Sequence, residues 1–180
     1  MWGELQEKKF LVLKDFLDPE KAKELGQEFQ DWCIERSVPG DSQVSKSSAF
    51  YRWGKFSELQ YDRIGYLNEK LGIWLLPTYN YARSYHNGAV MERHSDRPGC
   101  EVSVTCHLGG DEEWPIYFAS SEGEDVAVTL SPGEAILYLG CEIDHWRNEF
   151  TGSHYNQVFL HYVNSRGPWA FCENDVVKPT

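Results

Sequence analysis

The chain has 180 residues and a formal net charge of −11, and 41% of its residues are hydrophobic. This length suits a single domain over residues 1–180, and the apolar residues, with seven Trp among them, are enough to form a buried core. The composition therefore excludes a disordered chain. A general binder of phosphate backbones needs a basic face, so the acidic balance argues against nucleic acid as a partner.

The cysteines and the start of the chain indicate a compartment. An odd number of Cys without a CxxC pair argues against a disulfide framework or a structural zinc site, and predicts buried free thiols. The first ten residues lack the apolar stretch of a signal peptide, and no apolar run is long enough to span a membrane. The sequence therefore predicts a cytoplasmic protein without a membrane segment. The five cysteines are Cys33, Cys100, Cys106, Cys141 and Cys172.

The N-terminal part, about residues 1–76, is predicted to be a helical flank. Asp18 and Pro19 supply an N-cap and a proline in the first helical turn, and apolar residues at helical spacing follow. Gly72 is a plausible stop for a second helix. The predicted elements are a strand at 9–16, a helix that starts at Asp18 and includes Cys33, a loop at 37–50 and a helix at about 56–71.

From about residue 77 the hydrophobic period changes from that of a helix to two, which indicates strands separated by Gly, Pro and Asn turns. Two helices followed by about eight short strands predict a mainly β protein with flanking helices, whose architecture is a double-stranded β-helix, or jelly roll. The core of this jelly roll is expected at about 77–164, and a C-terminal tail at 165–180. The predicted strands are Thr78–Tyr85, Ala89–His94, Glu101–Leu108, Pro115–Ala119, Asp125–Leu130, Glu134–Leu139, Ile143–Arg147 and Tyr155–Val163.

Three side chains in this β region have the residue types of a metal site. His94 and Asp96 are two residues apart, so at strand spacing they point to the same side. His145 lies 51 residues later, within another predicted strand. Two His and one carboxylate on one face of an octahedral metal leave three positions open, which suits non-haem Fe(II). We expect these three residues to be the metal ligands and the catalytic centre.

The same residues lie in a pattern that resembles the prolyl-4-hydroxylase-type branch of the 2-oxoglutarate and Fe(II)-dependent oxygenases. The resemblance covers the second half of the chain well and the rest loosely. It consists of Tyr85 and Gly88 before His94 and Asp96, the turn and strand that begin at Pro132–Ala135, His145 in the place of the distal His, and the lead-in Phe16–Pro19.

This resemblance implies a function. Family members bind Fe(II), use 2-oxoglutarate as a co-substrate and O₂ as the oxidant, and release succinate and CO₂. The protein positions the reacting partners, and the metal and co-substrate carry the difficult steps. The resemblance therefore implies a hydroxylase that acts on an amino-acid residue or a small metabolite, so the expected partner is a peptide or small-molecule substrate. The sequence does not indicate an oligomeric state.

The family also anchors the far carboxylate of 2-oxoglutarate with a Lys or Arg nine to eleven residues after the distal His, where this chain has His154, Tyr155 and Asn156. Another group must then supply the contact. Arg147 shares the strand face of His145, and its planar fork suits a carboxylate. The predicted co-substrate residues are, in order, Arg147, His107, Tyr85 and Gln157; Arg83, Arg97 and His161 are further polar residues near the expected site.

Two other functions fit the sequence. A cupin-like metal-dependent isomerase or binding module on a similar barrel would hold a metal without using 2-oxoglutarate, and the absent Lys or Arg is in keeping with it. A catalytically silent interaction domain is the other alternative, although such a domain has no need of three converging ligands. Titration of 2-oxoglutarate against the metal-loaded protein separates the cupin-like alternative from the oxygenase, and loss of metal binding in Asp96→Ala would argue against the silent domain.

Overall fold

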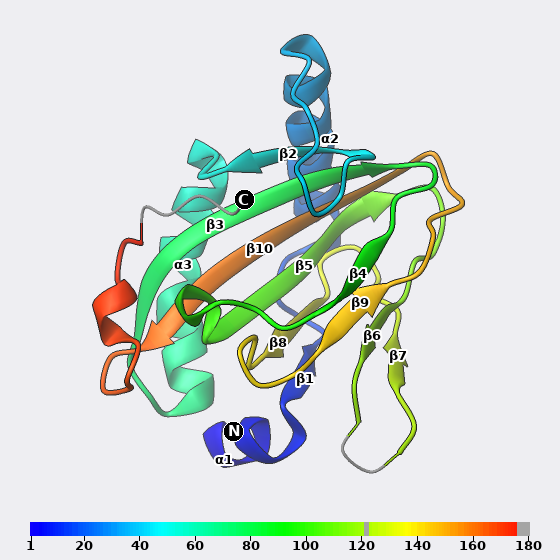
Figure 1. The fold of residues 1–180 in the computed structure, drawn as a ribbon. Helices are drawn as coiled ribbons and strands as arrows, with labels where there is room; N and C mark the ends of the chain where they lie inside the picture. Colours follow the sequence, from blue (N-terminus) through cyan, green and yellow to red (C-terminus); the bar gives the residue numbers. More distant parts are fainter. Residues whose placement is uncertain (121–122, 176–180) are drawn as a thin grey trace.

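The computed structural model describes residues 1–120 and 123–175. Within this part of the chain, three helices alternate with the first strands, and the remaining strands follow in the order shown in Figure 1. The helices are α1 (Trp2–Lys8), α2 (Pro19–Glu35) and α3 (Gly54–Leu71), with single 3₁₀ turns at η1 (Pro98–Cys100) and η2 (Ala170–Cys172). The strands are β1 (Phe10–Leu13), β2 (Ser47–Tyr51), β3 (Leu75–His86), β4 (Met91–His94), β5 (Val102–Gly110), β6 (Ile116–Phe118), β7 (Val126–Val128), β8 (Ala135–Tyr138), β9 (His145–Arg147) and β10 (His154–Asn164).

The strands form two antiparallel sheets. The larger has the order β1-β8-β5-β10-β3-β2 and the smaller has the order β4-β9-β6-β7. From β3 to β10 successive strands alternate between the two sheets, except that β6 and β7 both lie in the smaller one, which is the connectivity of a double-stranded β-helix. The predicted jelly roll is confirmed, and β1 and β2 extend its larger sheet at both edges. Among the described residues, no helix has the length and apolar character that crossing a bilayer requires.

Helices α2 and α3 cover one face of the larger sheet, with α2 against β5 and α3 against β3, while the smaller sheet faces the other side (Figure 1). The Asp18 side chain accepts hydrogen bonds at 3.0 Å from the backbone N–H groups of Glu20 and Lys21, as the predicted N-cap requires. Gly72 ends α3 with a φ of 72°, a conformation that favours glycine. Both predicted helices are thus confirmed.

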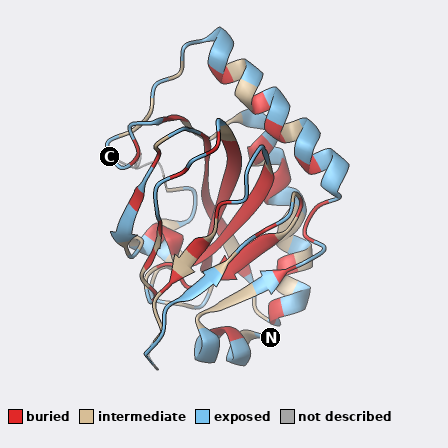
Figure 2. Ribbon diagram, turned by 90° about the vertical axis from the view of Figure 1, so that its right-hand side faces the viewer, coloured by how far each residue is buried: buried red, intermediate tan, exposed pale blue. Residues whose placement is uncertain are grey.

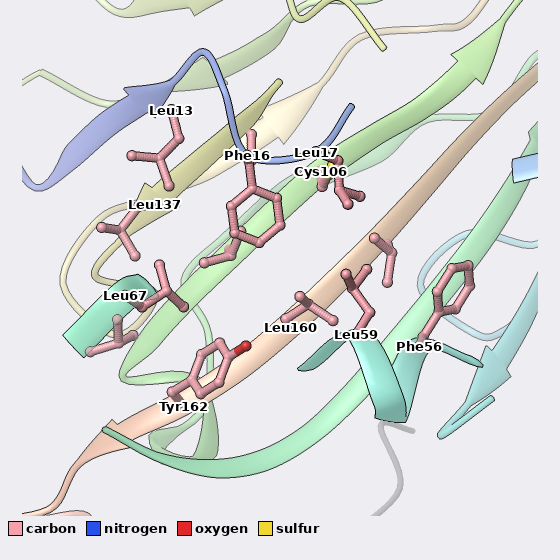
Figure 3. Close-up of a cluster of buried hydrophobic side chains, with 14 of the residues drawn as sticks. Leu13, Phe16, Leu17, Phe56, Leu59, Leu67, Cys106, Leu137, Leu160 and Tyr162 are labelled. Atoms are coloured by element: carbon pink, nitrogen blue, oxygen red, sulfur yellow. The ribbon is translucent and has the colours of Figure 1, made fainter. Parts of the chain in front are cut away.

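Two apolar clusters hold these layers together, and Figure 2 shows the central strands as the most continuously buried part of the chain. One cluster lies between the helices and the larger sheet; Leu13, Leu137 and Leu160 belong to it (Figure 3). The other lies between the two sheets and is rich in Tyr, Phe and Trp. Burying one such large apolar side chain contributes about 1.5–3 kcal/mol, so the strands that hold the site are firmly fixed.

The structure differs from the sequence prediction mainly near the N-terminus. The prediction of a loop at 37–50 is wrong in its last four residues, because β2 pairs antiparallel with β3 from Ser47 onward. The predicted strand at 9–16 is shorter, and α1 was not predicted. A polar edge strand and a seven-residue helix are both fixed by tertiary contacts rather than by their own periodicity. Residues 176–180 of the predicted tail lie outside the described part.

Candidate metal centre

The two histidines of the predicted site face each other across a strand pair. His94 ends β4 and His145 begins β9, and the two are directly opposite in the antiparallel register. Their rings are 4.4 Å apart between centroids. Asp96 follows β4, where its backbone N–H donates to the Gly140 carbonyl at 2.8 Å. The sheet thus brings together residues that are 51 positions apart in the sequence.

The donor atoms of the three side chains converge on one point. Asp96 Oδ1 lies 3.7 Å from His94 Nε2 and 3.8 Å from His145 Nε2. One ligand atom from each residue lies within 4.8 Å of the other two. Two imidazoles and one carboxylate in this arrangement have the donor types of a facial triad, with the opposite side open for further ligands.

Backbone carbonyls hold both imidazoles in the orientation that a metal needs. His94 Nδ1 bonds the Glu92 carbonyl at 2.7 Å, and His145 Nδ1 bonds the Ile143 carbonyl at 3.2 Å. Because a carbonyl only accepts, Nδ1 must carry the proton in each neutral ring. Nε2 then carries the lone pair in each ring, as in other histidine metal sites. In His94 this nitrogen also lies 2.9 Å from the amide nitrogen of Gln43.

The charge states of the three residues also fit a cation. Burial lowers the pKa of His145 to about 4, and burial together with the nearby His145 lowers the pKa of His94, so both rings are neutral. Burial raises the pKa of Asp96 to about 6. The charges of Arg83 and Arg97 act in the opposite direction without outweighing burial, so a divalent metal beside this carboxylate would stabilise its ionised form further. The donor set therefore fits Fe(II).

A cavity of about 330 Å³ opens against these three residues. Its wall combines aromatic rings with two arginines, Arg83 from β3 and Arg97 directly after Asp96. Arg97 pairs with the carboxylate of Asp175, and its guanidinium lies 4.6 Å from the Tyr79 ring centroid. The cavity is therefore suited to an anionic ligand with an apolar body.

Arg83 is the more deeply buried of these two arginines, with only 4% of its surface exposed. It pairs with Asp41, whose Oδ2 accepts from Arg83 Nη2 at 2.7 Å and from Nε at 2.9 Å. The Tyr81 hydroxyl donates to the same oxygen at 2.6 Å. Burial acts to raise the pKa of Asp41, but the Arg83 charge and hydrogen bonds from Tyr81 and the Val44 amide outweigh it, so the pKa is lowered and the carboxylate is ionised.

Arg147, the first of the predicted co-substrate residues, is not among the described residues that line this cavity. Its guanidinium is enclosed by aromatic rings, 4.7 Å from the Trp114 centroid and 5.0 Å from that of Tyr155, and it donates to the Trp114 carbonyl. His107 stacks on Tyr155 at 4.1 Å, and Tyr85 packs edge-on against Trp114. These residues therefore form a second, aromatic cluster between the two sheets.

Gln157, the fourth predicted co-substrate residue, links this cluster to the cavity. It lies opposite Arg83 on β3 and opposite His107 on β5 in the sheet register. Its amide nitrogen donates to Thr105 Oγ1 at 2.6 Å, while its buried carbonyl oxygen has no hydrogen-bond partner among the described residues. A role for Arg147, His107, Tyr85 or Gln157 in co-substrate binding stays a prediction.

Two contacts at the cavity were missed from the sequence. Asp41 and Gln43 lie in the segment predicted as a loop, and nothing in its polar composition distinguishes them. A third feature is a second set of possible ligands, Asp96, Cys100 and His161, which shares its carboxylate with the histidine pair. Asp96 and Cys100 are close in the sequence, and only the fold brings His161 of β10 to them.

Solved structures share this fold. A prolyl-4-hydroxylase from Pseudomonas putida superposes with a TM-score of 0.71 at 14% identity, over 92% of this chain and 97% of that one. A prolyl hydroxylase from Trichoplax adhaerens, in complex with a hypoxia inducible factor peptide fragment, gives 0.72 at 14% identity, over 98% and 90%.

HygX from Streptomyces hygroscopicus, solved with nickel and 2-oxoglutarate bound, gives a TM-score of 0.69 at 11% identity, over 91% of this chain and 86% of HygX. No protein-family model matches the sequence, and no curated protein matches it. The chain therefore has the fold of 2-oxoglutarate and Fe(II)-dependent oxygenases, including prolyl hydroxylases, as the sequence resemblance implied.

Proposed function

We propose that the chain is an Fe(II)- and 2-oxoglutarate-dependent oxygenase that hydroxylates an amino-acid residue or a small metabolite. The observation that carries this proposal is the convergence of His94, Asp96 and His145 at a cavity inside a jelly roll. When bound, Fe(II) with 2-oxoglutarate and O₂ supplies the oxidant for a C–H bond, and the co-substrate leaves as succinate and CO₂.

The residues of the chain act by holding and orienting these groups. The Glu92 and Ile143 carbonyls fix the two imidazole rings, and the Gly140 carbonyl fixes the backbone at Asp96. The ligands therefore need little rearrangement when a metal binds. Buried rings of the cavity wall, such as Tyr79 and Tyr138, exclude water from the bound reactants.

The neighbours and the charge of the chain support a peptide or a small molecule as the proposed substrate. The Trichoplax neighbour was solved with a peptide fragment, and HygX was also solved with hygromycin B bound, so both a peptide and a small molecule fit this fold. The net charge of −11 favours a neutral or cationic substrate over a nucleic acid. Free cysteines are in keeping with a reducing, cytoplasmic location.

One observation favours the cupin-like alternative, a metal-dependent isomerase or binding module without 2-oxoglutarate. The family position for the carboxylate anchor holds Tyr155, whose ring stacks on His107 instead of offering a charge. An oxygenase would therefore need another basic side chain to bind the far carboxylate of 2-oxoglutarate. Arg83 and Arg97 line the cavity, and Arg147 lies in the neighbouring aromatic cluster.

A two-stage experiment tests the proposal. The protein is loaded with Fe(II) without oxygen and titrated with 2-oxoglutarate in a calorimeter, and air is then admitted and succinate measured by mass spectrometry. The proposal expects saturable binding of one equivalent, followed by succinate formation that requires both Fe(II) and O₂. Metal binding without any heat from 2-oxoglutarate would point to the cupin-like alternative instead.

A further inference from the structure

The ion pair between Arg83 and Asp41 is an unusual feature of the cavity, because both partners are withdrawn from water. Their side chains are 5% and 13% exposed. The Arg83 guanidinium lies within 6.0 Å of the ring centroids of Tyr81, Tyr85 and Phe159, so aromatic surfaces surround it. An arginine in such a setting is costly without a carboxylate partner. Here that partner comes from the chain itself.

The same loop also reaches the metal ligands. Gln43 accepts from Arg83 Nη2 at 2.6 Å through its amide oxygen, and its amide nitrogen lies 2.9 Å from His94 Nε2. An amide nitrogen and oxygen are about 2.3 Å apart, so the Arg83 guanidinium is no more than about 8 Å from the ligand atom of His94. The carboxyl carbons of extended 2-oxoglutarate are about 5 Å apart, given four C–C bonds of about 1.5 Å. Arg83 is therefore within reach of a co-substrate held at the metal.

Asp41 and Gln43 belong to the connection 36–46 between α2 and β2, which extends over β3 and β10 near β4 (Figure 1). Asp41 also ties the loop into a turn, because its Oδ1 accepts from the backbone N–H groups of Gln43 at 3.0 Å and Val44 at 2.7 Å. One short turn thus presents a carboxylate to the buried cation and an amide to the metal-binding nitrogen of His94. Both contacts must be released if a metal and a dicarboxylate are to bind.

We propose that Arg83 and Tyr81 form the subsite for the far carboxylate of 2-oxoglutarate, and that Asp41 occupies this subsite as an internal competitor. The inference rests on the proposed function. Exchange of one carboxylate for another keeps the buried guanidinium paired at every stage, so the site avoids the cost of an isolated charge. The turn that holds Asp41 and Gln43 then acts as a gate, which opens as the co-substrate displaces both side chains.

The test is calorimetric titration of 2-oxoglutarate, without oxygen, into protein loaded with Mn(II), with thermal melting in parallel. Removing a bidentate charged contact with Arg83→Gln should weaken 2-oxoglutarate binding about 10- to 100-fold and leave Mn(II) affinity unchanged. Tyr81→Phe should weaken it several-fold. Asp41→Asn should strengthen it several-fold, lower the melting temperature of the ligand-free protein and enlarge the shift that 2-oxoglutarate causes.

A truncated ligand shows whether the lost contact is to the far carboxylate. The ligand 2-oxopentanoate has no second carboxylate, so wild-type protein should bind it about as weakly as the Arg83→Gln variant binds 2-oxoglutarate. The Arg83→Gln variant should bind 2-oxoglutarate and 2-oxopentanoate with similar affinity. Arg147→Gln tests the rival predicted anchor, and Asp175→Asn, which removes the carboxylate partner of Arg97, is the matched control. Both should keep the wild-type preference for 2-oxoglutarate.

The outcomes separate the two proposals. If wild-type protein binds Mn(II) but not 2-oxoglutarate, the proposed function fails. If wild-type protein binds 2-oxoglutarate and the Arg83→Gln variant binds it equally well, the subsite is wrong while the function stands. Loss of binding in Arg147→Gln alone would place the anchor in the aromatic cluster. If the Arg83→Gln variant does not fold, the Arg83→Lys variant, which keeps the charge, replaces it in the test. Its affinity for 2-oxoglutarate should lie between those of wild type and a variant without the charge.

Discussion

Gly140 is the position where a single methyl group should disturb the metal site through the backbone. It is buried in the turn after β8, and its carbonyl holds the backbone N–H of Asp96. A Cβ added there would lie 2.5 Å from Asp96 Oδ2, 2.5 Å from the Cys100 carbonyl oxygen and 3.0 Å from Asp96 Cβ. The Cys100 carbonyl oxygen is a backbone atom and cannot simply rotate away, so Gly140→Ala must displace the turn, the Asp96 side chain, or both.

The size of the effect can be worked out from these contacts. Inserting a methyl group into a packed interior costs about 1–3 kcal/mol, and the reduced freedom of the unfolded chain offsets about 0.4–1 kcal/mol of that. The expected net loss is about 1–2 kcal/mol, which for a chain of this size lowers Tm by about 2–8 °C. A displaced ligand carboxylate should also weaken metal binding about 10- to 100-fold.

Differential scanning calorimetry and Mn(II) titration measure the two effects. Gly65→Ala is the matched control, because Gly65 lies on the exposed side of α3 with no atom within 4 Å of an added Cβ. It should stabilise the helix by about 1 kcal/mol and leave metal affinity unchanged. If Gly140→Ala kept both the wild-type Tm and the wild-type Mn(II) affinity, the account of how Asp96 is positioned would be refuted.

Three further predictions concern the rest of the fold. Arg147→Gln should destabilise the protein by about 2–4 kcal/mol in urea denaturation, because it removes a buried guanidinium held between Trp114 and Tyr155 and leaves the Trp114 carbonyl without its donor. Burial, with the charge of Arg147, lowers the pKa of His107 to about 4, so between pH 6.5 and 4 the unfolded chain binds a proton that the folded chain excludes. The free energy of unfolding should therefore fall as the pH falls through this window, by up to about 1.4 kcal/mol per pH unit. Urea midpoints measured at pH 7, 6 and 5 should depend less on pH in the His107→Gln variant than in wild type. All five cysteines are free, so melting curves with and without a thiol reductant should coincide in the absence of oxygen, and a lower Tm with reductant would reveal a disulfide that stabilises the protein in solution.

The β architecture could be predicted because its signals are local. Period-two hydrophobicity and Gly or Pro turns located all eight jelly-roll strands, and the spacing of His94 and Asp96 put both on one strand side. The position of His145 opposite His94 follows from how β4 pairs with β9, which the number and order of strands in a jelly roll already imply.

The lining of the cavity could not be predicted in the same way. Asp41 reaches Arg83 from a loop 42 residues earlier, and no periodicity encodes such a contact. Arg147 shares a short strand with His145, yet the rings of Trp114, which precedes β6, and Tyr155 of β10 decide where its long side chain lies. Side-chain placement of this kind depends on packing between segments, so it becomes visible only in three dimensions.

Anaerobic titration of Fe(II) into metal-free protein tests most directly whether His94, Asp96 and His145 bind this metal. Wild-type protein should bind one equivalent, and Asp96→Ala should lose that binding while remaining folded by circular dichroism. Asp144→Ala removes a neighbouring carboxylate that pairs with Arg93 outside the cavity, so it should bind like wild type. Equal Fe(II) affinity in the Asp96→Ala and wild-type proteins, or no binding by either, would contradict the assignment.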